Sequence, residues 1–402
     1  MNREPEKLQL KRRKKKLRPV IAAALAVCIL LIGIAAFFWI YLGTNVKPPE
    51  VEVQNPDNPE EIISLPKETY TFLLVGRDNP NNSRNTDVLM LCSFDTKGGD
   101  VNVLQIPRDI YVVDPLAPYG GKINNIFNLA ATDYREKNPD ATSQAEFDYA
   151  MGYLCDKISD IFAVDVDFYL SFNTVMYREL LEIVCPITID VPFDMDYDDP
   201  TQDLHIHLKA GVQQLNPEQA EGFSRFRQNN GMTSGLPEGD FSRVDLQKMV
   251  LAAIAEKFFS NFTLPSAHAL AGTVWNNLDT DLEMNECIWF LQQALTLYTE
   301  GTMTLDSIRM YDLPCKVPTP WECTQLLGLD YTVSYGFMEK SFGYTLEILN
   351  KAFNTKDTPI TAEMLGYEEA VDLGGYCDHS DTEGQSLQQI LDNPPDLWIS
   401  NY

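Results

Sequence analysis

Two groups of charged residues lie in loops of the stretch from Tyr70 to Val113. The loop after the apolar run TFLLVG carries two carboxylates nine residues apart with an arginine between them, namely Asp78, Arg84 and Asp87. The second group follows the run DVNVLQIP and consists of Arg108 and Asp109. Carboxylates are ligands that divalent cations prefer, and arginine's planar fork suits a phosphate group. These residue types indicate a metal ion and a phosphorylated ligand, and solvated loop charges are the alternative.

Three apolar runs are expected to fix the positions of these loops. TFLLVG ends in glycine, and DVLMLCSF and DVNVLQIP follow it, separated by the turn-like segment DTKGGD. Short apolar runs between turn residues predict strands. Because strands are rigid, charges in the loops at their ends are well placed for chemistry.

Later segments alternate between helical and strand patterns. Residues 143–162 carry apolar side chains at helical spacing behind a Ser143 cap, residues 164–172 alternate like a strand, and Asn216 and Pro217 mark a helix start. Strands interleaved with helices predict an α/β or a mixed layered fold.

Two polar segments are interpreted as surface rather than as metal sites. The acidic segment 194–203 does not have the spacing of an EF-hand, which favours a solvated loop. His205 and His207 share one face of the strand-like LHIHL and are expected to be surface groups. The cysteines show no CxxC or Cys/His ligand spacing, which disfavours a zinc site.

The N-terminus predicts a membrane anchor. Residues 1–18 contain nine Lys or Arg and two Glu, and residues 20–42 run 23 residues without a charge. That run can cross a bilayer as a helix and exceeds the apolar core of a signal peptide, which is about 7–15 residues long. We therefore expect a basic cytoplasmic tail (1–19), a transmembrane anchor (20–42) and a stalk (43–68), with the remainder outside the cytoplasm.

The remainder of the chain is strongly acidic. Residues 19–402 contain 22 basic and 56 acidic residues, a net charge of −34. This balance disfavours nucleic acid as a partner and would repel an anionic substrate, so that binding one needs an arginine cluster or a metal. The arginines available for such a cluster are Arg84, Arg108, Arg225, Arg227 and Arg243. Surface ion pairs explain each of them singly just as well.

Five motifs in this order resemble the LytR-CpsA-Psr family of bacterial cell-envelope proteins. They are GRD(x5)RNTDVLML, LQIPRDIYV, GGKINNIF, LNPEQAEGFSRFRQ and GDFSRVDLQK. Together they are far more specific than any one of them. The resemblance implies one α/β/α-layered extracytoplasmic domain over residues 69–365, with a motif core over 69–260, behind the single transmembrane helix. The composition of residues 366–402 predicts an acidic C-terminal tail.

The resemblance also implies an activity. It is the Mg²⁺- or Mn²⁺-dependent transfer of an anionic glycopolymer, such as wall teichoic acid or capsule, from a polyprenyl-pyrophosphate carrier to peptidoglycan at the bacterial cell membrane. By position, Asp78 and Asp87 match metal-binding carboxylates. The pyrophosphate-binding positions are matched by Arg84, Arg108, Arg225, Arg227 and Arg243, and further polar positions by Asp109, Lys122, Asn124 and Gln247. We expect Arg108, Asp109 and Asp87 to be catalytic, with Asp109 or another carboxylate near Asp87 as the base.

The chain departs from the family pattern at three positions. Leu246 stands where a second arginine is usual, Ser242 where glycine is common, and Arg77 where an apolar residue is usual. The missing arginine bears on pyrophosphate binding or acceptor choice, and Arg77 could supply compensating charge. Two alternatives stay open: a pyrophosphatase acting on the same lipids, and a non-catalytic lipid-binding scaffold. A transcriptional regulator is disfavoured, because most of the chain is expected outside the cytoplasm.

Overall fold

The computed structural model describes most of the chain after residue 46. The described residues are 47–55, 58–77, 86–200, 204–236, 240–261, 278–316, 335–356, 358–368, 381–395 and 397–401. The predicted anchor lies before them, and Asp78 and Arg84 fall in the gap between residues 77 and 86. Across these ranges, no helix combines the length and apolar character needed to cross a membrane.

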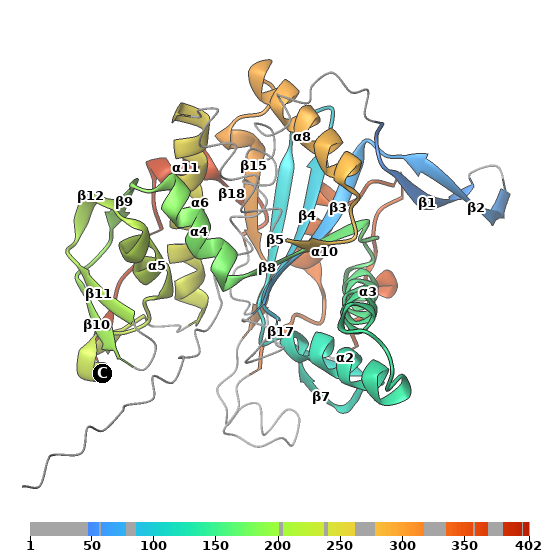
Figure 1. Ribbon diagram of the computed structural model, residues 1–402, viewed down its shortest axis with the longest axis horizontal. Helices are drawn as coiled ribbons and strands as arrows, with labels where there is room; N and C mark the ends of the chain where they lie inside the picture. Colours follow the sequence, from blue (N-terminus) through green and yellow to red (C-terminus); the bar gives the residue numbers. More distant parts are fainter. Residues whose placement is uncertain are drawn as a thin grey trace, which may run out of the picture.

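A mixed sheet forms the centre of the fold, which confirms the predicted mixed α/β class (Figure 1). In the described part of the chain its strand order is β14–β8–β3–β4–β5–β15–β18. The pairs β3–β4 and β4–β5 are antiparallel, whereas β3–β8 and β5–β15 are parallel. In chain order these strands are β3 (Thr69–Arg77), β4 (Thr86–Asp95), β5 (Val101–Ile106), β8 (Phe168–Asn173), β14 (Asp279–Thr280), β15 (Ile308–Asp312) and β18 (Gln385–Ser386).

Different helices bury the two faces of the sheet, because successive side chains of a strand point to opposite sides. Leu73 and Val75 of β3 belong to one apolar cluster, and Phe72 and Leu74 belong to the other. The first face is covered by α2 (Ile126–Lys137), α3 (Ser143–Phe162) and α10 (Gly343–Ala352). The second cluster draws on α4 (Thr174–Val184), α5 (Pro217–Arg225), α6 (Asp240–Asn261), α8 (Met284–Thr299) and α11 (Leu387–Asp392).

The central strands and the helix predicted from sequence patterns are present in the structure. The three apolar runs lie in β3, β4 and β5, and the helix predicted over 143–162 is α3. Its cap differs from the expected Ser143, because the hydroxyl of Thr142 accepts the hydrogen bond from the amide of Ala145. The turn between β4 and β5 places Gly99 at a φ of 80°, a conformation that glycine adopts without steric cost.

Short strand pairs surround the central sheet. They are β1 (Glu50–Asn55) with β2 (Asn58–Pro66), β6 (Tyr111–Asp114) with β7 (Ala117–Lys122), β9 (Ile187–Val191) with β12 (Gly211–Leu215), β10 (Met195–Asp199) with β11 (Leu204–Leu208), β13 (Ser234–Gly235) with β19 (Ser400–Asn401), and β16 (Cys315–Lys316) with β17 (Phe337–Met338). Short 3₁₀ turns are η1 (Ile123–Asn125), η2 (Asn230–Met232), η3 (Leu305–Ser307) and η4 (Ala362–Met364).

Three segments differ from the sequence-based expectation. The predicted stalk contains the hairpin β1–β2. The segment expected to be a solvated acidic loop contains β10, because Met195 points into the core while Asp196 and Asp198 alternate with it towards solvent. The expected acidic tail contains α11, whose Leu387 and Ile390 are buried against the core, and β18, which pairs with β15. The elements β18 and α11 of this segment are therefore part of the folded domain.

Candidate active site

Asp87 lies at the start of strand β4, and Arg108 lies just after the end of the neighbouring strand β5. Antiparallel pairing places Leu89 of β4 opposite Ile106 of β5, so that the start of β4 lies beside the loop that follows β5. Arg108 Nη1 donates a hydrogen bond of 3.0 Å to Asp87 Oδ1. The Asp87 side chain is only 8% exposed, and that of Arg108 is 25% exposed. The pair therefore lies at the wall of a pocket rather than in open solvent.

Lys122 and Asn124 contact the loop after β5, which contains Arg108 and Asp109. Lys122, at the end of β7, places its Nζ 2.7 Å from Asp109 Oδ1. Asn124, in η1, is buried, and its backbone amide donates a hydrogen bond of 3.3 Å to the backbone carbonyl oxygen of Arg108. The backbone carbonyl oxygen of Asn124 accepts a hydrogen bond of 3.2 Å from the hydroxyl of Thr86. These contacts orient the loop and bring the predicted positions from two motifs together.

Helix α6 carries Arg243 and Gln247 into the same pocket. They are four residues apart, one helical turn, so both lie on one face of the first two turns. The N-terminal end of a helix favours anions, because its free amide groups and the helix dipole are directed at the ligand. The pocket is lined by Asp87, Val88, Leu89, Gln105, Ile106, Pro107, Arg108, Asp109, Arg243, Val244, Asp245, Gln247, Asp312 and Leu313.

Two buried amide side chains in this pocket have polar atoms without a hydrogen-bond partner among the described residues. They are the Nε2 of Gln247, whose side chain belongs to a residue that is 4% exposed, and the Oε1 of Gln105. Both side chains line the pocket. A buried donor or acceptor without a partner costs about 1–3 kcal/mol, so these two atoms are suited to bind polar groups of a ligand.

A buried lysine joins two carboxylates that sequence reasoning did not select. Lys248 Nζ lies 2.5 Å from Asp312 Oδ2 and 3.2 Å from Asp245 Oδ1, and its side chain is 5% exposed. Burial acts to lower the pKa of Lys248, but the two carboxylates outweigh it and raise that pKa above its usual value. The three-residue spacing of Asp245 and Lys248 on α6 could have indicated their ion pair. No sequence spacing could have indicated Asp312, because the parallel pairing of β15 with β5 brings it to Lys248.

Two of the predicted arginines lie elsewhere. Arg225, at the end of α5, places its Nη1 2.9 Å from Glu221 Oε1. It lines a separate cavity of about 310 Å³, together with Arg178, which binds Glu221 through two hydrogen bonds. Arg227 follows α5, and its carbonyl oxygen accepts a hydrogen bond from the amide of Leu236. Neither arginine is among the residues that line the pocket of Asp87 and Arg108.

Two of the three departures from the family pattern, those at Leu246 and Arg77, have structural explanations. Leu246 is 0% exposed and belongs to the core, so this position points away from the pocket. Arg77 is held by Asp279 at 2.5 Å and Ser171 at 2.7 Å, and it stacks on the ring of Phe147 at 4.3 Å. Burial lowers the pKa of Arg77, although Asp279 opposes this effect. Arg77 therefore serves a structural ion pair, and the idea that it supplies compensating charge to the pocket is wrong.

Known proteins are similar to this chain in sequence. Residues 40–315 match the LytR_cpsA_psr family. TagV of Bacillus subtilis (strain 168), named polyisoprenyl-teichoic acid–peptidoglycan teichoic acid transferase, is 24% identical over 257 residues, which cover 63% of this chain and 60% of TagV. TagU of the same strain carries the same descriptive name and is 21% identical over 286 residues, which cover 70% of this chain and 83% of TagU.

A solved structure shares the architecture. The crystal structure of protein gbs0355 from Streptococcus agalactiae superposes with a TM-score of 0.54 and 18% sequence identity, and the match covers 76% of this chain and 93% of that one. At this identity the likeness concerns the fold alone. The family match spans more than half of the chain, and the protein therefore belongs to the LytR_cpsA_psr family.

Proposed function

We propose that the protein transfers a phosphoglycan, of the wall teichoic acid or capsule type, from a polyprenyl-pyrophosphate carrier to peptidoglycan. The observation that carries this proposal is the convergence of Asp87, Arg108, Arg243 and Gln247 on one pocket. Membership of the LytR_cpsA_psr family agrees with it, and so do the names of TagV and TagU.

The pocket residues fit the charges that this reaction creates. A hydroxyl oxygen of the acceptor attacks the phosphorus that carries the glycan, the bond from that phosphorus to the bridging oxygen breaks, and the lipid monophosphate leaves. The guanidinium groups of Arg108 and Arg243 would bind phosphate oxygens, and the amide of Gln247 would add a donor. The hydroxyl proton passes to a carboxylate, for which we propose Asp109, because it lines the pocket.

We propose Mg²⁺ or Mn²⁺ as the cofactor. Mg²⁺ in proteins takes one or two carboxylates and completes its shell with phosphate oxygens and water. Asp87, at the pocket wall, fits that donor set, and Asp78, its predicted partner, lies outside the described residues. When bound, the ion would supply positive charge opposite the phosphate oxygens.

We further propose that residues 20–42 anchor the protein in the bacterial cell membrane, with the N-terminus in the cytoplasm and the domain outside. The 23-residue uncharged run behind a basic segment supports this orientation. It would place the pocket in the compartment that contains peptidoglycan and the exposed head group of the lipid carrier. The strongly acidic composition beyond residue 18 gives no support to a nucleic-acid partner.

The test is a transfer assay with defined components. The full-length protein is incubated with a lipid-pyrophosphate-linked glycan and peptidoglycan, with and without Mg²⁺, beside Asp87→Ala and Arg108→Ala. Arg135→Ala is the matched control, because Arg135 forms an exposed ion pair with Glu146 away from the pocket. The expected result is glycan joined to peptidoglycan by the wild type and the control only, and only with Mg²⁺.

Three other results would overturn the proposal or its placement in this pocket. Release of glycan phosphate without joining to peptidoglycan would identify a pyrophosphatase that uses water as the acceptor. Tight binding of the lipid without any product would identify a non-catalytic scaffold. Full transfer by Arg108→Ala would show that the site is placed in the wrong pocket.

A further inference from the structure

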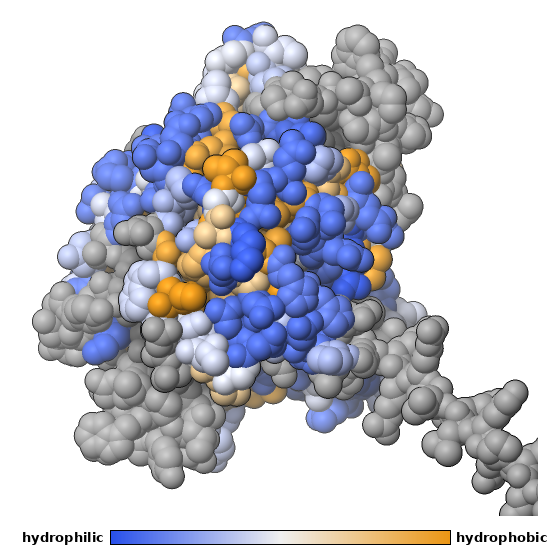
Figure 2. All heavy atoms as spheres, turned by 90° about the vertical axis from the view of Figure 1, so that its left-hand side faces the viewer, coloured by the Kyte–Doolittle hydropathy of each residue, from blue (hydrophilic) through white to orange (hydrophobic). Residues whose placement is uncertain are grey.

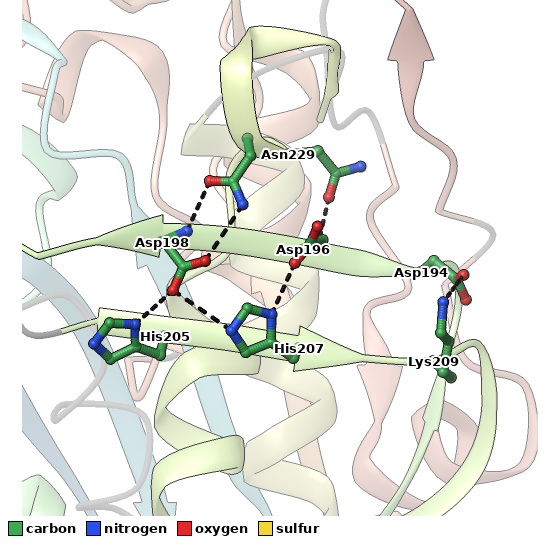
Figure 3. A network of polar contacts seen from close by, with 8 residues as sticks. Asp194, Asp196, Asp198, His205, His207, Lys209 and Asn229 are labelled. Atoms are coloured by element: carbon green, nitrogen blue, oxygen red, sulfur yellow. Dashed lines mark hydrogen bonds and ion pairs between the residues drawn. The ribbon is translucent and has the colours of Figure 1, made fainter.

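A second group of metal-ligating side chains lies on the hairpin β10–β11. This hairpin belongs to the left-hand side of the molecule in Figure 1, and Figure 2 shows the described surface of that side as largely hydrophilic with a band of hydrophobic side chains. Asp198, His205 and His207 are exposed there, and one ligand atom from each lies within 4.8 Å of the others. Figure 3 shows both imidazoles directed at the Asp198 carboxylate.

Pairing across the hairpin explains part of this arrangement. Asp198 lies directly opposite His205, and Asp196 directly opposite His207, so that each aspartate has a histidine as its cross-strand neighbour. The corresponding distances are 2.5 Å from Asp198 Oδ1 to His205 Nδ1 and 2.7 Å from Asp196 Oδ1 to His207 Nδ1. Hydrogen-bonded side-chain pairs at such cross-strand positions stabilise a hairpin modestly.

Cross-strand pairing does not explain the diagonal contact. His207 Nε2 lies 3.5 Å from Asp198 Oδ1, although His207 already has a direct partner in Asp196. Two ligands of a tetrahedral zinc ion with bonds of about 2.0–2.1 Å are about 3.3–3.4 Å apart, so this separation suits a shared ion. The shorter distance between His205 and Asp198 is that of a hydrogen bond. A bound ion would replace this hydrogen bond, and the two exposed side chains would move apart to hold it.

The neighbours of these residues have the form of an outer ligand shell. Asp196 accepts from Nδ1 of His207 and so directs the other ring nitrogen, Nε2, towards Asp198. Metal-binding histidines usually donate their second N–H to a carboxylate in this way. Asn230 fixes the strand beside Asp198, since its Oδ1 accepts a hydrogen bond from the Asp198 amide at 2.9 Å.

We propose that Asp198, His205 and His207 form a site for a first-row transition-metal ion of the Zn²⁺ class, with Asp196 as the residue that positions His207. Imidazole nitrogen suits Zn²⁺, whereas Mg²⁺ and Ca²⁺ prefer oxygen ligands. Three protein ligands on an exposed face leave at least one coordination position open to a water or another external oxygen ligand. None of its three residues lines the pocket of Asp87 and Arg108, and the proposal replaces the expectation that the two histidines are plain surface groups.

The experiment measures Zn²⁺ binding to the full-length protein by competition with a chelating indicator, in millimolar Mg²⁺ to occupy oxygen-ligand sites. The variants are His205→Ala, His207→Ala and Asp196→Asn. The matched control is Asp194→Asn, because Asp194 pairs with Lys209 at 2.7 Å near the same hairpin. Co²⁺ absorption spectra then distinguish nitrogen and oxygen ligands from cysteine thiolates.

The expected result is one equivalent of Zn²⁺ at micromolar affinity or tighter and a Co²⁺ spectrum without thiolate charge transfer. Each histidine variant should weaken binding by more than 10-fold, Asp196→Asn by about 10–100-fold, and Asp194→Asn should leave it unchanged. The side chains are exposed, so circular dichroism should show that all variants fold. Zn²⁺ affinity unchanged in both His205→Ala and His207→Ala, a thiolate spectrum, or no binding by the wild type would each overturn the proposal.

Discussion

Arg108 and Asp87 form an ion pair that connects the loop after β5 to the start of β4, with 3.0 Å between Nη1 and Oδ1. The two residues have different roles in the proposed reaction, because one would bind phosphate and the other a metal ion. Each side chain therefore holds the other in position before a ligand is bound. This arrangement reduces the reorganisation needed when substrate enters.

The first prediction concerns the charge of Asp87. Asp87→Asn keeps the size of the side chain but removes the negative charge, so the transfer rate should fall by about 10²-fold or more. Thermal unfolding should show a melting temperature within a few degrees of the wild type. Asp133→Asn is the control, because Asp133 pairs with Lys137 on the surface of α2. A transfer rate above half of the wild-type value would contradict the assignment of Asp87 as a metal ligand.

The second prediction separates function from stability at Gln247. Gln247→Leu removes a buried Nε2 that has no hydrogen-bond partner in the described protein, so the free energy of unfolding should stay the same or rise by about 1 kcal/mol. Affinity for the lipid pyrophosphate should nevertheless fall about 10-fold or more, since a hydrogen bond to a charged group contributes about 1.5–3 kcal/mol. Denaturant unfolding and lipid-binding titrations test both parts. A less stable variant with unchanged lipid affinity would show that Gln247 serves packing alone.

The third prediction addresses the missing family arginine. Leu246 is 0% exposed in the core, so Leu246→Arg should destabilise the protein by at least about 3 kcal/mol. It should give no gain in transfer rate, because the position does not face the pocket. Urea unfolding and the transfer assay test this expectation, with the volume-conserving Leu246→Met as the control. A stable and more active Leu246→Arg would mean that α6 is rotated from the orientation described.

The fourth prediction concerns Lys248. Lys248→Met leaves Asp245 and Asp312 without their shared cation, so the free energy of unfolding should fall by about 3 kcal/mol. The pKa of Lys248 is raised above its ordinary value of 10.5, so its contribution is fully present below that pH and is lost only above the raised pKa. The wild-type-to-variant difference should therefore be the same at pH 6 and pH 9. A difference that shrinks strongly at pH 9 would contradict the paired, charged state of Lys248.

The parts of the fold that follow local patterns could be predicted from the sequence. Apolar runs between turns gave β3, β4 and β5, and the one-turn spacing of Arg243 and Gln247 placed both on one face of α6. The strand β10 was missed because its many aspartates suggested a loop, although Met195 alternates with them as a strand requires. The C-terminal segment was missed because its acidic composition obscured two apolar residues of α11, Leu387 and Ile390.

Non-local contacts set the limit of prediction at the site. Asp312 reaches the pocket because β15 pairs with β5 across about two hundred residues of chain, and no spacing in the sequence signals that register. Arg225 matched the family motif, but its direction depends on Glu221 one turn earlier in α5. The pairing of Lys122 with Asp109 likewise depends on how β6 and β7 fold back together.

The packing of α11 against α6 has a consequence for biogenesis. Helix α6 carries Arg243 and Gln247, and it packs against α11, which begins about 140 residues after Gln247. β18, directly before α11, closes one edge of the central sheet beside β15. A nascent chain therefore contains both pocket residues long before the segment that supports their helix has been synthesised. Helix α6 is fully packed only once the residues of α11 have been synthesised, so a product that ends before them has the pocket motifs but lacks packing that supports one of the pocket's helices.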